Sequence, residues 1–202
     1  MKIKVCGMLY PENISEVTQL SIDMIGLIFY GKSPRYAGML HPDNLSVIPR
    51  HIDKVGVFVD ETLENILMIA GRFDLQIIQL HGNESPELCG RLRSYKYKVV
   101  KVFSISDRID NDKILQYENY CDYILFDTKT SQHGGSGKQF DWTILSTYNC
   151  SIPYFLSGGI GPDDMKIIRQ LSSGKLYAVD LNSRFEIKPG LKDINKLAEF
   201  IK

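Results

Sequence analysis

Short apolar segments alternate with helical patterns eight times along the chain, and no other feature constrains the fold as strongly. The expected strands lie at residues 2–6, 22–29, 55–59, 75–80, 99–103, 123–126, 152–156 and 176–179. The run at 123–126 is apolar on both faces, which suits a parallel strand covered by helices. Alternating strands and helices predict a parallel sheet, and the count of eight favours a closed (β/α)8 barrel over an open doubly wound sheet.

Helix boundaries are predicted at several positions between these strands. Pro11 should open the first helix, Asp60 should cap the helix that buries Leu63, Ile66, Leu67 and Ala70, and Ser85 with Pro86 should begin another. The weakest helical pattern covers residues 41–48. The last helix is expected to place five residues on its apolar side, namely Leu191, Ile194, Leu197, Ala198 and Ile201.

Length and charge narrow the class of protein. The 202 residues allow about 25 per strand–helix unit, near the lower limit of roughly 200 for such a barrel, so we expect residues 1–202 to form one domain. The 24 basic and 24 acidic residues balance, which disfavours nucleic acid and membrane surfaces as partners. Without a signal-peptide pattern or a span-length apolar run, a cytoplasmic location is expected. The four scattered cysteines predict reduced thiols and no zinc site.

Asp127 is the first candidate for catalysis. It directly follows the buried segment 123–126 and precedes a polar, glycine-rich stretch at 128–139, which we expect to be a mobile loop. In a parallel barrel the carboxyl ends of the strands form the ligand-binding rim. A strand-end Asp alone is more often a helix cap or turn former, so the alternative stays open at this point.

The same rim should gather further polar residues. Cys6, Arg35, Gln79 and His81 follow or end earlier strands, and the loops after the seventh and eighth strands read Ser157-Gly158-Gly159 and Asp180-Leu181-Asn182-Ser183. Glycine loops and helix N-termini after those strands usually bind phosphate in this fold, although two glycines can also mark a plain turn. Cys6 is either a proton-transfer thiolate or a buried structural residue, and Arg35 either binds a carboxylate or is solvated. His133 is expected to be solvated, and no two histidines have the spacing of a metal site.

Taken in order, these segments resemble the phosphoribosylanthranilate isomerase family of tryptophan biosynthesis over nearly the whole chain. The matching segments are Lys4-Val-Cys6-Gly7, 26–29, Ser33-Pro34-Arg35, 55–59, Gln79-Leu-His81-Gly82, Asp127-Thr128, 134–137, 140–142, 156–159, 180–183, Glu186, Pro189-Gly190 and Lys192-Asp193. The resemblance implies a ribulose-phosphate-binding barrel and a cofactor-free aldose–ketose isomerase. It would perform an Amadori rearrangement of N-(5-phosphoribosyl)anthranilate by general acid–base catalysis.

The resemblance also implies residue roles. Asp127 would protonate the ribose ring oxygen, and Cys6 would remove the proton on C2. Arg35 would pair with the anthranilate carboxylate, while the phosphate would bind at Gly158, Gly159, Asn182 and Ser183. Ser157, Asp180, Gln79 and His81 are the remaining candidates for substrate binding, and no metal ligand is expected. Lys4, two residues before Cys6 on the same strand face, is a possible contributor to ionising the thiol.

Two departures and two rival functions accompany this interpretation. Arg184 stands where relatives commonly carry a small residue, and Ser136 replaces a frequent Thr. One rival is another sugar-phosphate barrel, such as an indole-glycerol-phosphate synthase or a ribulose-phosphate lyase or epimerase; these need an essential lysine, paired acids or metal ligands. The other is a binding protein without turnover, which would be expected to have lost the acid or base. The expected assembly is a monomer, with a dimer left open.

Overall fold

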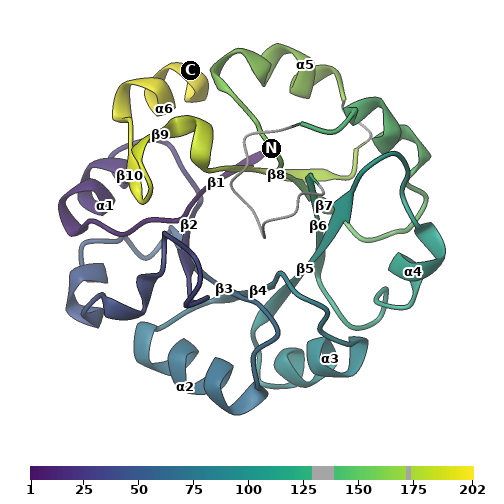
Figure 1. Cartoon of the computed structure of the whole chain (residues 1–202), viewed down its shortest axis with the longest axis horizontal. Helices are drawn as coiled ribbons and strands as arrows, with labels where there is room; N and C mark the ends of the chain where they lie inside the picture. Colours follow the sequence, from purple (N-terminus) through teal and green to yellow (C-terminus); the bar gives the residue numbers. More distant parts are fainter. Residues whose placement is uncertain (129–138, 172–173) are drawn as a thin grey trace.

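The computed structural model describes residues 1–128, 139–171 and 174–202, and in them eight parallel strands close into a barrel (Figure 1). Each strand pairs with the next in the chain, and β8 pairs with β1 to complete the ring. The strands are β1 (Lys2–Cys6), β2 (Met24–Ile28), β3 (Asp53–Phe58), β4 (Ile77–Leu80), β5 (Lys98–Ile105), β6 (Tyr123–Thr128), β7 (Tyr154–Leu156) and β8 (Leu176–Leu181). The predicted (β/α)8 barrel is confirmed.

Helices surround the strands, as Figure 1 shows. The α-helices are α1 (Pro11–Val17), α2 (Leu63–Phe73), α3 (Pro86–Ser94), α4 (Asn111–Leu115), α5 (Met165–Gln170) and α6 (Ile194–Ile201). The 3₁₀ turns are η1 (Ala37–Met39), η2 (Pro42–Leu45), η3 (Trp142–Thr147), η4 (Pro162–Asp164) and η5 (Ser183–Phe185). A short antiparallel hairpin, β9 (Glu186–Lys188) and β10 (Leu191–Lys192), joins η5 to α6.

The prediction of a helix at residues 41–48 is wrong, because this part of the chain forms only the 3₁₀ turn η2. Pro42 begins the turn and Pro49 follows shortly after it. The residue before a proline is disfavoured in the helical conformation, so Pro49 limits how far a helix that begins at Pro42 can extend.

Two other expected boundaries are also wrong. Asp60 does not cap α2, because it lies two residues too early with a φ of 49° and accepts a hydrogen bond from the backbone of Asn83. The cap is Thr62, whose side chain accepts from Asn65. Leu191 belongs to β10 and not to the last helix, which begins after the capping residue Asp193.

The interior of the barrel changes from apolar to polar along its axis. A cluster of apolar side chains fills its middle, namely Met24, Val55, Ile77, Val100, Val102, Leu125, Phe155 and Ala178. Alternate residues of a strand face the same side, so the inward positions that follow Ile77, Leu125 and Ala178 are occupied by Gln79, Asp127 and Asp180. The apolar cluster therefore forms the floor of a polar site at the carboxyl ends of the strands.

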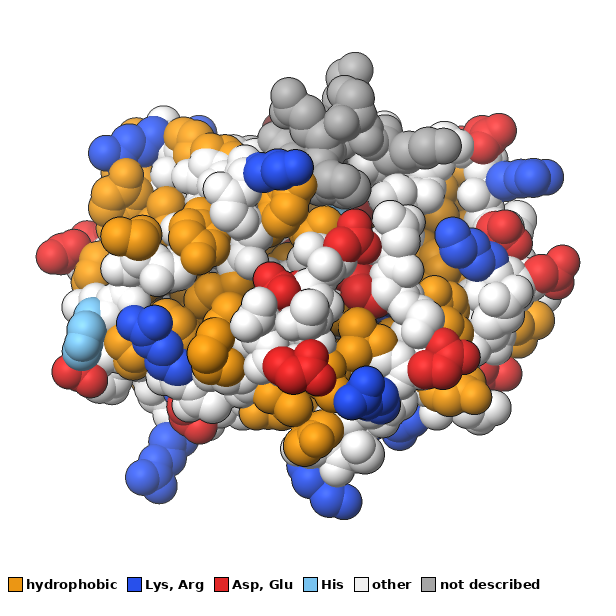
Figure 2. Space-filling view, turned by 60° about the horizontal axis from the view of Figure 1, so that its bottom comes forward, with side chains coloured by type: hydrophobic (Ala, Val, Ile, Leu, Met, Phe, Trp, Pro, Cys, Tyr) orange, Lys and Arg blue, Asp and Glu red, His pale blue; other side chains and the backbone are white. Residues whose placement is uncertain are grey.

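The outer surface is mixed in character. On the face shown in Figure 2, basic and acidic side chains are interspersed with apolar ones. Among the described residues, no helix is both long enough and apolar enough to cross a membrane.

Candidate active site

A buried lysine lies at the centre of the polar end of the barrel. Lys4 on β1 is fully buried, and its Nζ donates to Gln79 Oε1 and Asp180 Oδ1, each at 2.9 Å. These contacts join β1 to β4 and β8 across the barrel interior. Burial alone would lower the pKa of Lys4, but the neighbouring Asp180 and Cys6 outweigh it and leave that pKa raised. Lys4 is therefore a charged ammonium at neutral pH.

Cys6 ends β1 two residues after Lys4, and only 3% of it is exposed. The thiol packs over Gly26 of β2, where a Cβ would lie only 2.6 Å from Sγ. Burial raises the pKa of the Cys6 thiol, while the charges of Lys4 and Lys192 act in the opposite direction. The thiol is therefore mainly protonated at neutral pH.

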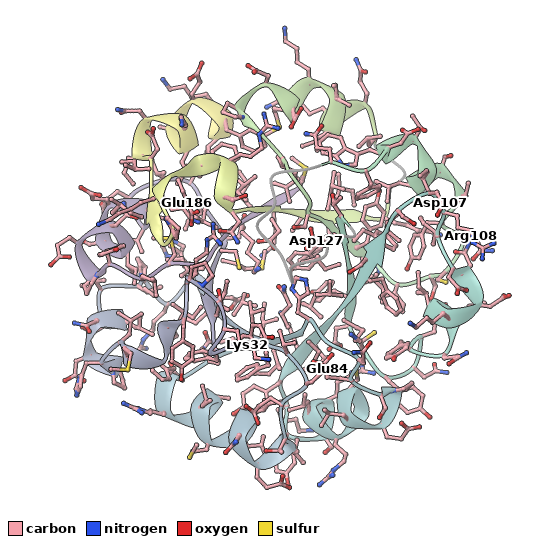
Figure 3. The ribbon with its side chains drawn as sticks, viewed as in Figure 1. Lys32, Glu84, Asp107, Arg108, Asp127 and Glu186 are labelled. Atoms are coloured by element: carbon pink, nitrogen blue, oxygen red, sulfur yellow. The ribbon has the colours of Figure 1, made fainter. Side chains whose placement is uncertain are left out.

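Asp127 lies inside the ring of strands near the end of β6, with 8% of its surface exposed (Figure 3). Its Oδ1 accepts from the backbone N–H of Thr128 at 2.9 Å, and its Oδ2 lies 3.3 Å from His81 Nε2. The other ring nitrogen of His81 is 3.5 Å from the amide nitrogen of Gln79. Because Lys4 holds Oε1 of Gln79, this amide turns its nitrogen towards His81 Nδ1.

The two loops predicted to hold phosphate lie next to these groups. Gly158 and Gly159 have φ values of 87° and 68°, which suit glycine, and Ser157 N donates to Phe126 O of β6. A Cβ at Gly158 would lie 3.2 Å from Asp127 Oδ1, so this loop runs directly past the carboxyl. The loop after β8 contributes Asn182 and Ser183, where η5 begins.

The unusual Arg184 bridges the same two loops. A Cβ built on Gly161, in the loop after β7, would lie 2.9 Å from Arg184 Nε and 3.0 Å from its Nη2. The exposed arginine therefore packs over a residue without a side chain, and this contact explains how the larger residue is accommodated after β8.

Arg35 forms a double hydrogen bond with a residue that sequence reasoning had not placed in the site. Its Nε lies 2.8 Å from Glu186 Oε1, and its Nη2 lies 2.6 Å from Oε2. Glu186 Oε1 also accepts from Lys192 Nζ at 2.7 Å, and the same ammonium donates to Asn182 Oδ1 at 2.8 Å. Burial alone would raise the pKa of Glu186, but Arg35 and Lys192 hold it below its usual range.

The structure thus gathers every candidate site residue of the described chain at the carboxyl ends of the strands. It adds Lys192 and Glu186, whose only sequence signal was their place in the matching segments near the C-terminus. The glycine-rich segment with His133 and Ser136 lies outside the described residues. No three His, Cys, Asp or Glu side chains within 1–128, 139–171 and 174–202 are placed to hold a metal ion.

Comparisons with known proteins identify the family of this chain. The family model described as N-(5′-phosphoribosyl)anthranilate (PRA) isomerase matches residues 3–202. The N-(5′-phosphoribosyl)anthranilate isomerase of Parabacteroides distasonis is 46% identical over 203 residues, covering 100% of this chain and 92% of the relative.

Solved structures give the same result. A crystal structure of monomers made from the dimeric Thermotoga maritima enzyme has a TM-score of 0.81 and 32% identity, covering 100% of this chain and 97% of the other. A phosphoribosyl anthranilate isomerase in complex with reduced 1-(o-carboxyphenylamino)-1-deoxyribulose 5-phosphate has a TM-score of 0.79 and 31% identity, with the same coverage. The chain belongs to the N-(5′-phosphoribosyl)anthranilate isomerase family.

Proposed function

We propose that this protein isomerises N-(5′-phosphoribosyl)anthranilate to 1-(2-carboxyphenylamino)-1-deoxyribulose 5-phosphate, a step of tryptophan biosynthesis. The observation that carries the proposal is the placement of a carboxyl and a thiol at the same end of one barrel. Asp127 is the residue before the last of β6 and Cys6 is the last of β1, and both lie above the apolar floor. The adjoining glycine loop supplies backbone N–H groups for a phosphate.

The reaction needs one proton given and one proton taken. Asp127 donates its proton to the ribose ring oxygen, so that the C1–O bond breaks and the C1–N bond becomes an imine. The Cys6 thiolate then removes the proton from C2, which gives an enolamine. Tautomerisation of the enolamine to the C2 ketone completes the rearrangement, and no net oxidation occurs because the change at C1 balances that at C2.

The substrate's two anionic ends have separate places in this proposal. The phosphate binds between Ser157, Gly158 and Gly159 on one side and Asn182 and Ser183 on the other. The anthranilate carboxylate binds Arg35. Since Nε and Nη2 of Arg35 already hold Glu186, we expect the substrate to approach its Nη1 edge.

Three other predicted substrate-binding residues already have partners inside the barrel. Gln79 and Asp180 bind Lys4, and His81 faces Asp127. Direct contact with substrate stays a prediction for all three, and we expect them to act mainly by orienting these partners. The monomeric state and cytoplasmic location also stay predictions.

The test is the loss of fluorescence as phosphoribosylanthranilate, made in place, is converted. Wild-type protein should turn it over, while Cys6→Ser and Asp127→Asn should lose most of kcat. Cys121→Ser is a matched control, because Cys121 is a buried thiol whose hydrogen bond to Tyr117 O a hydroxyl can keep. Normal turnover in the Cys6 and Asp127 variants would refute the assigned roles.

The role of Arg35 is tested by comparing how its replacement changes KM and how it changes kcat. Arg35→Met should raise KM much more than it lowers kcat, because the guanidinium is assigned to the unreacting carboxylate. An unchanged KM would contradict the proposed contact.

A further inference from the structure

The surroundings of Lys4 are unusual for a structural ion pair. A fully buried ammonium is costly, and a single carboxylate would be enough to neutralise it. Lys4 instead has a second hydrogen-bond partner, Gln79 Oε1, which accepts at 2.9 Å. The Cys6 side chain is also a neighbour of the ammonium, since each of the two groups shifts the pKa of the other.

The strand geometry explains why the ammonium and the thiol meet. Lys4 and Cys6 are two residues apart on β1, so both side chains face the barrel interior. An ammonium carries three N–H donors, and Gln79 and Asp180 accept from two of them, which leaves a third donor that can face Cys6. Gly26 has no side chain, and the thiol occupies the space that a side chain there would need.

The charges that face the thiol come from three elements. Lys4 on β1 and Lys192 on β10 favour the thiolate, whereas Asp180 on β8 opposes it. Lys4 exerts the largest favourable effect on the pKa of the thiol, against the burial that raises it. Removing Lys4 and removing Asp180 should therefore have opposite effects on ionisation of Cys6.

We propose that Lys4 is a positioning residue for the isomerisation: its buried ammonium, on the same strand face as Cys6, stabilises the thiolate that accepts the C2 proton. Asp180 and Gln79 hold the ammonium in place. This inference rests on the role proposed for Cys6 as base. Its physical core, the coupling of a buried cation to a thiol, can be measured without any turnover.

The experiment measures how readily Cys6 ionises in the whole protein. Iodoacetamide alkylation of Cys6 is followed by peptide mass across a pH series, and the ultraviolet absorbance of the thiolate is read against Cys6→Ser as a blank. Lys4→Met should move ionisation to higher pH, with at least a tenfold slower alkylation at neutral pH. Asp180→Asn should move it to lower pH. The pH profile of kcat/KM should shift in the same directions.

Lys101→Met is the matched control, because it removes another buried lysine that binds Glu84 and backbone carbonyls on β4 and β5 and not Cys6. It should leave the ionisation of Cys6 unchanged. If Lys4→Met does not fold, the double variant Lys4→Met/Asp180→Asn leaves no unpaired charge, and it should ionise Cys6 at higher pH than Asp180→Asn alone.

The possible results separate the two proposals. Shifts of the same sign in Lys4→Met and Asp180→Asn, or no shift in either, would overturn the role of Lys4 even in an active isomerase. Opposite shifts would support it. If the wild-type protein showed no isomerisation while the opposite shifts appeared, the proposed function would fail and the coupling would stand.

Discussion

Replacing Gly158 with alanine tests whether the phosphate loop and the carboxyl of Asp127 share one rigid arrangement. Gly158 has a φ of 87°, where a residue with a Cβ is strained by about 1–2 kcal/mol. The new Cβ would also lie 2.7 Å from the backbone nitrogen of Thr128, which donates to Asp127 Oδ1. Relief of this overlap requires a shift of β6, for which overpacking adds about 1–3 kcal/mol. We therefore expect Gly158→Ala to lose about 2–5 kcal/mol in total.

Gly174→Ala separates strain from overlap. Gly174 has a similar φ of 71°, but a Cβ there would meet no atom of the described residues within 4 Å. This variant should lose only the strain energy of about 1–2 kcal/mol. Urea unfolding followed by far-ultraviolet circular dichroism gives the two free energies, and the isomerase assay gives kcat. Displacement of Asp127 by a fraction of an ångström should reduce kcat about 10- to 100-fold in Gly158→Ala and leave it unchanged in Gly174→Ala.

The reasoning would be refuted if both variants were destabilised equally and Gly158→Ala kept its kcat. A rise in KM alone would place the effect on phosphate binding and would contradict a displacement of the carboxyl.

Three further predictions concern stability and are measured by denaturant unfolding. Lys101→Met should lower the free energy of unfolding by about 3–5 kcal/mol, because the Glu84 carboxylate, which is 1% exposed, loses its cation. Lys54→Met should lower it by less than about 1 kcal/mol, because the partner carboxylate of Lys54 is exposed. Burial raises the pKa of Cys89 to about 12, so the protonated thiol favours the folded state fully below its usual pKa, and this part of the free energy of unfolding is lost as pH rises towards 12. Cys89→Ala should therefore reduce the fall in the free energy of unfolding over this alkaline range by up to about 1.4 kcal/mol per pH unit. Asp193→Ala should cost about 1 kcal/mol, since Asp193 accepts from two backbone N–H groups at the start of α6.

The barrel could be predicted because each strand is covered on both faces and leaves a short apolar run in the sequence. One of the errors arose where a long-range contact decides local structure. Leu191 fits the helical spacing of α6, but Gly190, with a φ of 84°, turns the chain into the β9–β10 hairpin. Asn13 of α1 then holds that hairpin through the backbone of Lys192, a contact across most of the chain. No local pattern contains this information.

The location of the site could be predicted for a related reason. Parallel strands end at one edge, so residues such as Gln79 and Asp127 are brought together whatever their distance in sequence. The partners of these residues could not be predicted. Arg35 pairs with Glu186 only because the hairpin after β8 brings Glu186 into the site (Figure 3). The sequence does not show this pairing.

The balance of charge in the site explains how it can bind an anionic substrate without a strongly basic chain. Lys4 binds Asp180, and both Arg35 and Lys192 bind Glu186, so these cations already have carboxylate partners before substrate arrives. Under the proposed roles, a phosphate at Gly158 and Gly159 is held largely by backbone N–H groups, and the anthranilate carboxylate shares Arg35 with Glu186. The buried ion pairs then contribute less to affinity than to orientation, because they hold the Lys4 ammonium and the Arg35 guanidinium in fixed positions before either acts on substrate.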